Sequence, residues 1–562
     1  MKKLILLLAI AFTVNNTFSQ TPVVEKLQAL SKNASKGYFY DAVQNPETGG
    51  IEVSYKFKGK SKDDKGTFET YYFDKDLNFS KQEETTVLKS DIADKPGYTK
   101  SYIYARVGGC TSFDILSTTL KLSKQTFEYK WNSDKKNFTR KRTEDVEIKP
   151  KNDDKRTFSG YDVFNAGDYA MVLVSSETKG EDKKMRKDFI LLRVGIDLSI
   201  KEMPLPLDAS QLVYSTVMEN GNSNTDSETD DDCELCNSDM VFVFAPTFDK
   251  KNPTDYKKYT YLKVDKNGVV KENVKIDAPA ANLIITGVAQ AKDGATYLFG
   301  SYNKEEKTFD QLYKEYSPLP NPCYTNGVNY RMDTYERATE KMEMDFVTLI
   351  KMNNGKTEWI KNTSVEDLAK VVKTPAGQKK ASAYTGKRLK IQYFNVLPNN
   401  DIFISGQLVG SEMMDKAYWK TYKDVICLQF TSKGEIVAQY GAKPESIDDK
   451  QNIIFSIPQF FYPNADGSVV YWNLLETNVF KGYADFWDAY NGDATFYRNF
   501  HPSMIKINAA TKEIMDYQEI GKRKYLLNQH CPFIYNEKDG TIIYIGSDKK
   551  SNLWLAKYTM GK

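Results

Sequence analysis

The fold is decided by a strand–turn–strand unit whose clearest copy is VICLQFTSKGEIVAQ, Val425 to Gln439. Apolar residues alternate on both sides of a Lys-Gly turn, a pattern typical of two short antiparallel strands. Further copies begin at Tyr259 (YTYLKVDKNGVVKEN), Phe346 (FVTLIKMNNGKTEWI) and Pro502 (PSMIKINAATKEIMD). Equivalent positions lie roughly 80 residues apart, and a regular period of this kind indicates an architecture built from repeats.

A second unit, a tight turn followed by an apolar strand, precedes these copies. It reads KDGATYLFGS from Lys292, NNDIFISGQL from Asn399 and KDGTIIYIGS from Lys538. Asp-Gly and Asn-Asp pairs tolerate positive φ and favour hairpin turns. Three of the strands carry a glycine soon after the apolar run: Gly300, Gly406 and Gly546. Each period therefore holds four strand-sized segments, and the sequence predicts an all-β fold.

Four short strands per repeat, joined by hairpins, resemble the repeats of β-propeller proteins. A single four-stranded sheet cannot bury both faces, whereas blades packed around an axis bury them against one another. The resemblance covers most of residues 37–562 and implies seven or eight four-stranded blades with long inserted loops. The Trp-Asp and Gly-His signatures of WD40 blades and the double glycine of kelch blades are absent. The alternative is two or three stacked β-sandwich domains.

The N-terminus predicts export. Lys2 and Lys3 precede an apolar run from Leu4 to Val14, and NNTFSQ follows. This is the layout of a secretory signal peptide, predicted to occupy residues 1–19. No later apolar run is long enough to cross a bilayer. We therefore expect a periplasmic protein, peripheral to the outer membrane at most.

Residues 20–36 predict a short helix that covers one end of the propeller. Thr21 can cap it and Pro22 suits its first turn. One helical face would carry the apolar residues Val23, Val24, Leu27 and Leu30. The last repeat copy, LWLAKYTMGK, lacks its final strand, so we expect a strand from residues 37–60 to close the ring.

The composition argues against several classes of function. The chain has 78 Lys and Arg against 75 Asp and Glu, so it has no field that would attract nucleic acid. It has 2 histidines, which leaves few general bases or metal ligands. No nucleophile elbow, phosphate-binding loop or zinc-protease motif is present. The sequence therefore predicts no catalytic residue and a protein that is not an enzyme.

Four insertions interrupt the repeats, at residues 219–239, 301–345, 362–388 and 480–503. The third begins with a predicted helix capped by Ser364. The fourth is rich in aromatic residues, either folded back over a blade edge or exposed to a protein partner or a sugar. The candidates for such contacts are Tyr483, Phe486, Trp487, Tyr490, Phe496 and Tyr497. A hydrolytic site is a further alternative, formed by Asp485, Asp488, Asp493 and His501, although their spacing matches no known motif.

The first insertion contains TDSETDDDCELCNSD, Thr225 to Asp239. A redox centre would need a helix start after the first cysteine, and zinc would need two further ligands. Calcium is the remaining alternative, with Asp226, Glu228 and Asp230 as ligands, although the glycine and glutamate of an EF-hand are missing. The favoured interpretation is an exposed acidic hairpin tip with a Cys233–Cys236 disulfide.

The other cysteines are Cys110, Cys323, Cys427 and Cys531, and their pairing stays open. Cys427 and Cys531 lie in apolar strand-like runs, which favours buried, inert thiols.

The Ser-Gln ending of the signal peptide resembles those common in Gram-negative bacteria that use the type IX secretion system. The resemblance implies an accessory or plug-like subunit of an outer-membrane export complex. We therefore expect a periplasmic scaffold that binds a membrane-embedded protein partner in the cell envelope. The alternative is a carbohydrate-active or glycan-binding propeller that uses residues 480–503.

Overall fold

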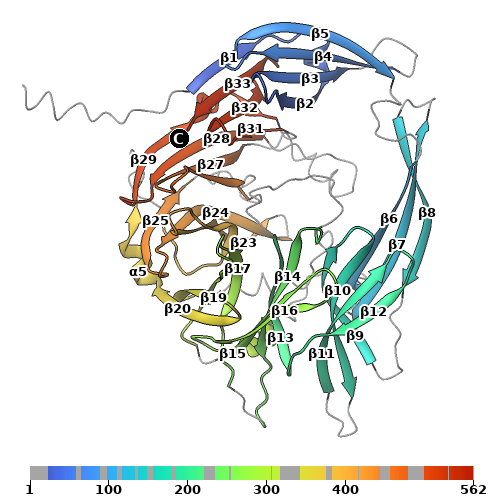
Figure 1. Cartoon of the computed structure of the whole chain (residues 1–562), viewed down its shortest axis with the longest axis vertical. Coiled ribbons are helices and arrows are strands. Elements are labelled where there is room, and N and C mark those ends of the chain that lie inside the picture. The colour runs from blue at the N-terminus through green and yellow to red at the C-terminus, as the bar shows by residue number, and fades with distance from the viewer. Residues whose placement is uncertain are drawn as a thin grey trace, which may run out of the picture.

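The computed structural model describes residues 23–57, 65–88, 98–109, 117–132, 137–148, 156–179, 185–219, 234–251, 255–305, 307–316, 342–374, 382–414, 417–443, 456–478, 499–528 and 531–560. Within these ranges the chain is almost entirely β-strand, arranged in eight sheets. Figure 1 shows the sheets following one another along a curved path, with the first sheet beside the last. All but one short strand pair is antiparallel, an arrangement compatible with a β-propeller.

Apart from β1, which joins the last sheet, each sheet is built from strands that are consecutive in the chain. The first three sheets contain β2 (Tyr38–Gln44), β3 (Ile51–Phe57), β4 (Lys65–Phe73) and β5 (Phe79–Leu88); β6 (Tyr98–Gly109), β7 (Ser117–Asn132) and β8 (Asn137–Ile148); and β9 (Arg156–Asn165), β10 (Tyr169–Lys179), β11 (Met185–Gly195) and β12 (Ile200–Pro204). The next two contain β13 (Ser210–Glu219), β14 (Ser238–Pro246), β15 (Lys258–Val264) and β16 (Val270–Asp277); and β17 (Ile284–Gln290), β18 (Thr296–Tyr302), β19 (Phe346–Asn353) and β20 (Lys356–Ser364).

The C-terminal sheets follow the same plan. They contain β21 (Val372–Lys373), β22 (Leu389–Val396), β23 (Ile402–Met414), β24 (Ala417–Phe430) and β25 (Ile436–Ala442); β26 (Gln459–Pro463), β27 (Val469–Asn478), β28 (Asn499–Asn508) and β29 (Glu513–Glu519); and β30 (Leu526–Leu527), β31 (Phe533–Asn536), β32 (Thr541–Ser547) and β33 (Leu553–Thr559). Short helical elements are η1 (Ala34–Lys36), α3 (Phe309–Tyr316), α5 (Val365–Lys370) and η4 (Ile520–Arg523). In the part of the chain described, no helix has the length and apolar character needed to span a bilayer.

The last sheet is completed by the N-terminus. Strand β1 (Val23–Gln28) pairs antiparallel with β33, from Val23 opposite Tyr558 to Gln28 opposite Leu553. The helix predicted over residues 20–36 is therefore wrong in its main part. The edge of β33 offers main-chain partners to an extended segment, and this tertiary pairing overrides the helical spacing of the apolar residues.

The expectation that a strand from residues 37–60 pairs with the last sheet is also wrong, because β2 and β3 occupy that range and belong to the first sheet. The pairing that joins the two ends of the chain uses residues 23–28 instead.

Core clusters pack most neighbouring sheets face to face. One core cluster joins the first sheet to the last, through residues such as Val53 and Tyr71 against Ile543 and Leu555. From the β9–β12 sheet onward, a further core cluster joins each sheet to the next. Trp472 is buried between the β22–β25 and β26–β29 sheets. Trp554 is buried between the β26–β29 sheet and the last sheet. Side chains on both faces of these sheets are therefore buried, which explains the runs of apolar residues without strict alternation in β14 and β32.

The link between β1 and β2 is fixed on the first sheet by Ser31. Its Oγ donates a hydrogen bond to Glu69 Oε2 at 2.7 Å, and its N–H donates to the Tyr71 hydroxyl at 2.8 Å. Glu69 is 2% exposed and also accepts from Gln82 Nε2 at 2.7 Å. A buried carboxylate needs such donors, so this group of contacts holds the start of the chain in place.

The recurring glycines allow strands to approach closely. Gly300 and Gly406 lie opposite irregularities in β17 and β22, where the pairing register shifts. A Cβ on Gly406 would collide with the Lys390 carbonyl oxygen, and one on Gly546 with that of Leu526. These glycines are required because main chain, which cannot move away easily, occupies the space a side chain would need.

We expect Gly406→Ala to lower the free energy of unfolding by about 1–3 kcal/mol, because the new methyl group meets main chain. Gly410→Ala, on the same strand, is the control: its Cβ would contact the Thr421 hydroxyl at 3.3 Å, and we expect a change within about 0.5 kcal/mol. Urea unfolding of both variants measures the difference. Equal stability of the two variants would contradict the assignment.

Candidate functional site

The β9–β10, β15–β16, β22–β23 and β26–β27 turns lie at one end of the strands. The Tyr169 hydroxyl, beside the β9–β10 turn, donates to the Lys266 carbonyl oxygen in the β15–β16 turn at 2.7 Å. Gly467, in the β26–β27 turn, lies against Asn399 of the β22–β23 turn. We call this the short-turn end. In an antiparallel sheet, the connections that alternate with these turns leave at the opposite end, which we call the long-loop end.

Three of the four predicted insertions lie at the long-loop end. The segments 301–345 and 480–503 connect second to third strands, β18 to β19 and β27 to β28. The segment 362–388 connects the fourth strand β20 to the next sheet. Only the acidic segment 219–239, between β13 and β14, leaves at the short-turn end. The sequence identified the insertions but did not reveal this division.

Two helices begin these long connections, each with a capping side chain. The predicted helix after Ser364 is confirmed as α5, and Ser364 Oγ accepts from Asp367 N–H at 3.0 Å. In α3, Thr308 Oγ1 accepts from Gln311 N–H at 3.2 Å, and Gln311 Oε1 accepts from Thr308 N–H at 2.9 Å. The second arrangement is a capping box, which satisfies main-chain donors at both residues.

Most of the predicted contact residues lie outside the described ranges. These are the aromatic candidates Tyr483, Phe486, Trp487, Tyr490, Phe496 and Tyr497, the acidic residues Asp226, Glu228, Asp230, Asp485, Asp488 and Asp493, and Cys233. Cys236 is described and is disulfide-bonded. Its pairing with Cys233 stays a prediction.

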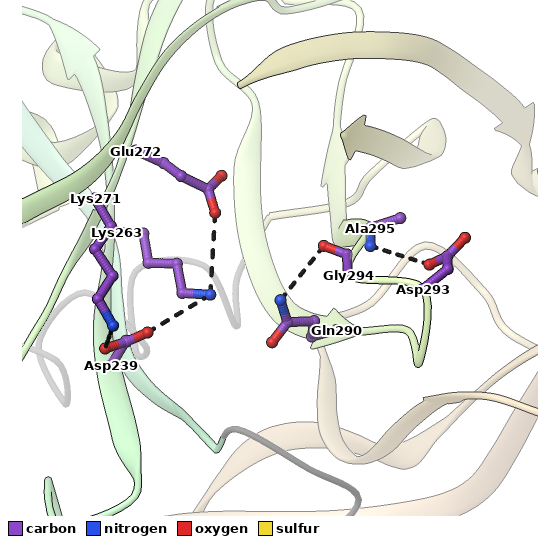
Figure 2. A network of polar contacts seen from close by, with 8 residues as sticks. All are labelled: Asp239, Lys263, Lys271, Glu272, Gln290, Asp293, Gly294 and Ala295. Carbon is purple, nitrogen blue, oxygen red and sulfur yellow. Dashed lines mark hydrogen bonds and ion pairs between the residues drawn. The ribbon is translucent and has the colours of Figure 1, made fainter. Parts of the chain in front are cut away.

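A buried ionic cluster forms at the start of β14, where the acidic segment ends. Asp239 on β14, Lys263 on β15 and Lys271 and Glu272 on β16 point toward one another across three adjacent strands (Figure 2). Lys271 Nζ lies 2.8 Å from Asp239 Oδ1, and Lys263 Nζ lies 3.6 Å from Asp239 Oδ2 and 3.9 Å from Glu272 Oε1. The side chains of Lys263 and Asp239 are only 7% and 4% exposed.

Strand pairing explains the cluster. Lys263 and Glu272 are direct cross-strand partners, and opposite charges at such positions stabilise a sheet. Two ammonium groups and two carboxylates balance, so the buried charge of Lys263 is compensated. Within the described ranges, no group of His, Cys, Asp and Glu side chains could hold a metal ion. The cluster therefore anchors β14, the strand that follows the acidic segment, to β15 and β16.

The neighbouring β17–β18 turn faces this cluster in Figure 2. Its side chains are engaged within the turn: Ala295 N–H donates to Asp293 Oδ1 at 3.0 Å, and Gln290 Nε2 donates to the Gly294 carbonyl oxygen at 3.3 Å.

The end of the acidic segment is also fixed to the preceding sheet. Leu235 N–H donates to the Asn165 carbonyl oxygen at 2.9 Å, and Asn165 N–H donates to Glu234 Oε2 at 2.9 Å. The Leu235 side chain is 0% exposed and packs with Phe164 and Phe242. Glu234 and Leu235, which precede Cys236, are therefore held by contacts with the preceding sheet.

A second buried polar cluster lies at the long-loop end, where β27 and β28 meet the aromatic segment. Glu476 is 1% exposed. It accepts from Arg523 Nη2 at 2.7 Å, from Ser503 Oγ at 2.8 Å and from the Tyr517 hydroxyl at 3.4 Å. Burial raises the pKa of Glu476, and the Arg523 cation opposes that shift.

The turn that delivers Arg523 has an unusual main chain. Gly521, Lys522 and Arg523 have φ angles of 72°, 45° and 57°. Residues other than glycine in this left-handed region cost about 1 kcal/mol each. The ion pair with the buried Glu476 carboxylate supplies a compensating interaction, so Glu476 holds the turn between β29 and β30 in this conformation.

His501 lies at the start of β28, beside this cluster, and is 3% exposed. Burial, and then the nearby Arg523 cation, lower the pKa of His501 to about 4. The imidazole is therefore neutral near pH 7.

The two free cysteines in the described residues are Cys427 and Cys531. Cys427 is fully buried, as predicted, and burial raises the pKa of its thiol. Cys531 is only partly buried, and burial raises its pKa to about 11. Both are protonated near pH 7 and poorly nucleophilic.

No protein-family model matches the chain, and no curated protein matches it either. Solved structures do resemble it. The WD40 domain of SCAP from fission yeast has 8% sequence identity and a TM-score of 0.24, and the match covers 96% of this chain and 98% of that one.

Two further solved structures are enzymes. Synechocystis apocarotenoid oxygenase has 8% identity and a TM-score of 0.25, with 89% of this chain and 90% of that chain covered. The mannose phosphorylase MPT-4 from Leishmania mexicana has 10% identity and a TM-score of 0.20, with 71% and 82% covered. The presence of enzymes among the matches overturns our prediction that the chain is not an enzyme. At these TM-scores, the likeness assigns no activity to it.

Neither ionic cluster was predicted from the sequence. The only sequence signal was a charged residue within an apolar strand, such as Lys263 in YTYLKV or Glu476 in VVYWNLLETN. A charge in such a position needs a partner, but the partner is found only when the strand pairing is known.

Asp239→Asn should lower the free energy of unfolding by about 3 kcal/mol, because it removes the nearest carboxylate from the buried Lys263. Asp277→Asn is the matched control, since Asp277 and its partner Lys258 are 74% and 50% exposed, and it should change stability by at most about 1 kcal/mol. Urea unfolding of both variants provides the measurement. A loss no larger in Asp239→Asn than in the control would show that the cluster is not an anchor.

The His501 pKa predicts a pH dependence of stability. The group has a pKa of about 4 when folded, against 6.5 ordinarily, so the unfolded chain binds more protons between these values. Stability should therefore rise with pH across this window, and His501 should contribute about 3 kcal/mol to that rise.

His501→Gln removes the titrating group. Unfolding of the parent and the variant by urea at several pH values between 4 and 7 should show a shallower pH dependence for the variant. Parallel curves would mean that the imidazole titrates normally in the folded protein.

Proposed function

We propose that the chain is an exported eight-bladed β-propeller whose long-loop end binds a protein partner in the cell envelope. The observation that carries this proposal is the division of the insertions, since three of the four leave at the same end of the strands. The eight sheets of the described residues and the pairing of β1 with β33 support the blade count and the closure. Long connections on a rigid scaffold are typical of binding surfaces.

The location rests on the predicted signal peptide at residues 1–19, which directs the chain to the periplasm. The Ser-Gln ending of that peptide supports a more specific proposal, an accessory subunit of an outer-membrane export complex of the type IX kind. The partner would then be a membrane-embedded protein that meets the propeller at its long-loop end.

Buried anchors beneath the loops support a docking role. The contacts of Glu476 with Arg523, Ser503 and Tyr517 hold β27, β28 and η4 together where the aromatic segment begins. A rigid base reduces the entropy that a loop loses on binding. All three donors approach the Glu476 carboxylate from within the fold, so Glu476 acts as a positioning residue for the segment.

The experiment compares two loop replacements in the otherwise complete protein. In one variant a short Gly-Ser linker replaces residues 482–497 at the long-loop end. In the matched control the same linker replaces residues 222–231 at the short-turn end. Chemical cross-linking and affinity purification from envelope extracts should recover a membrane protein with the parent and the control, and lose it with the first variant.

Recovery of the same membrane protein with both variants would overturn the placement of the interface. Recovery of no envelope protein with the parent would overturn the binding function. Glycan binding through residues 480–503 is the alternative, and a glycan array probed with the parent and the first variant tests it. A glycan signal that disappears with the first variant would replace the protein partner by a carbohydrate ligand.

A further inference from the structure

Strand β1 is held mainly by its main chain. None of its six side chains is fully buried, and Val24 and Leu27 are 41% and 50% exposed. Val23 alone packs against the core of the last sheet. The side-chain hydrogen bond from Trp554 Nε1 to Glu25 Oε2 is long, at 3.4 Å. Pairing of this kind tolerates many sequences, because its affinity comes from main-chain hydrogen bonds.

Strand β33, in contrast, is held from three sides without β1. It pairs with β32 along its whole length. Its side chains alternate between two core clusters, Trp554, Ala556 and Tyr558 in one and Leu553 and Leu555 in the other. All five are at most 1% exposed. Because these contacts come from neighbouring sheets, the edge of β33 keeps its shape when β1 leaves.

The residues that follow β1 have contacts of their own with the first sheet, so they can stay in place when β1 detaches. Leu30 packs into the core of the first sheet, and Ala34 is 1% exposed. Ser31 is bound to Glu69 and Tyr71. Residues from Leu30 onward are therefore anchored separately, and β1 can detach up to Ala29 without disturbing the first sheet.

We propose that the edge of β33 is an acceptor for an extended strand of a partner protein, which replaces β1. The register of β1 defines the ligand chemistry: six residues, antiparallel, with apolar side chains opposite Tyr558 and Trp554 and few restrictions between them. Once β1 has left, the freed edge of β33 can accept such a strand through main-chain hydrogen bonds. This site is separate from the long-loop end and does not depend on the proposed interface there.

In the intact chain β1 competes with the incoming strand. A short tether gives β1 an effective concentration in the millimolar range, so it blocks the edge against weak ligands. A partner strand therefore succeeds when its own affinity is high or when the rest of the partner is already bound nearby.

Hydrogen exchange of the intact protein tests the first requirement. Amides of residues 23–28 should exchange at least tenfold faster than those of β32, which lies one strand further into the same sheet. Equal protection of β1 and β32 would overturn the proposal, because β1 would then open only with the whole fold.

Peptide binding tests the acceptor itself. The probe is a fluorescent peptide of sequence TPVVEKLQ, and the control peptide TPVVEPPQ has two prolines that remove main-chain donors. A variant that lacks residues 21–28 should bind the probe at least tenfold more tightly than the intact protein, and neither should bind the control peptide. Failure of a folded deletion variant to bind the probe would overturn the proposal.

If the deletion variant does not fold, the double variant Lys26→Pro, Leu27→Pro replaces it, and its affinity for the probe is compared with that of the intact protein. Adjacent prolines weaken β1 whichever of the two residues donates to β33. Light scattering of the intact protein measures its oligomeric state. A dimer whose subunits exchange β1 would overturn the proposal, because the strand bound to β33 would then come from a second copy of the chain.

Discussion

The packing of the first sheet against the last is the interaction on which the arrangement of the sheets depends. It places Val53 and Tyr71 in one core with Ile543, near the other end of the chain, and the pairing of β1 with β33 adds main-chain contacts at the same junction. Closing so long a loop costs entropy, which the face-to-face burial between successive sheets must offset. Ser31 then fixes the start of the chain through the buried Glu69 carboxylate.

The two buried ionic clusters serve the two ends of the strands in similar ways. Asp239 and Lys263 lie below the acidic segment at the short-turn end, and Glu476 and Arg523 lie below the aromatic segment at the long-loop end. Each cluster includes a strand that flanks an insertion, β14 for Asp239 and β27 for Glu476. A buried charge that loses its partner is strongly destabilising. Each cluster therefore stabilises the strand ends next to an insertion as long as the sheets remain folded.

The sequence predicted the elements that depend on local pattern. Turn residues and apolar alternation located most strands and the recurring glycine at 406, and the structure adds the reason for that glycine, the approach of the Lys390 carbonyl. Residues 23–28 were misread because their apolar spacing suits a helix as well as a strand, and their partner lies at the far end of the chain. The contact between Glu476 and Arg523 was hidden for the same reason, since it joins β27 to a turn beyond β29.

The pairing of β1 with β33 is tested most directly by a cross-link in its register. Val24 and Lys557 are cross-strand partners, so Val24→Cys combined with Lys557→Cys should form a disulfide on mild oxidation, detected by mass spectrometry of the joined peptides. Val24→Cys with Thr559→Cys, two residues out of register, should form little. A disulfide that forms in neither double variant, or equally in both, would contradict the account.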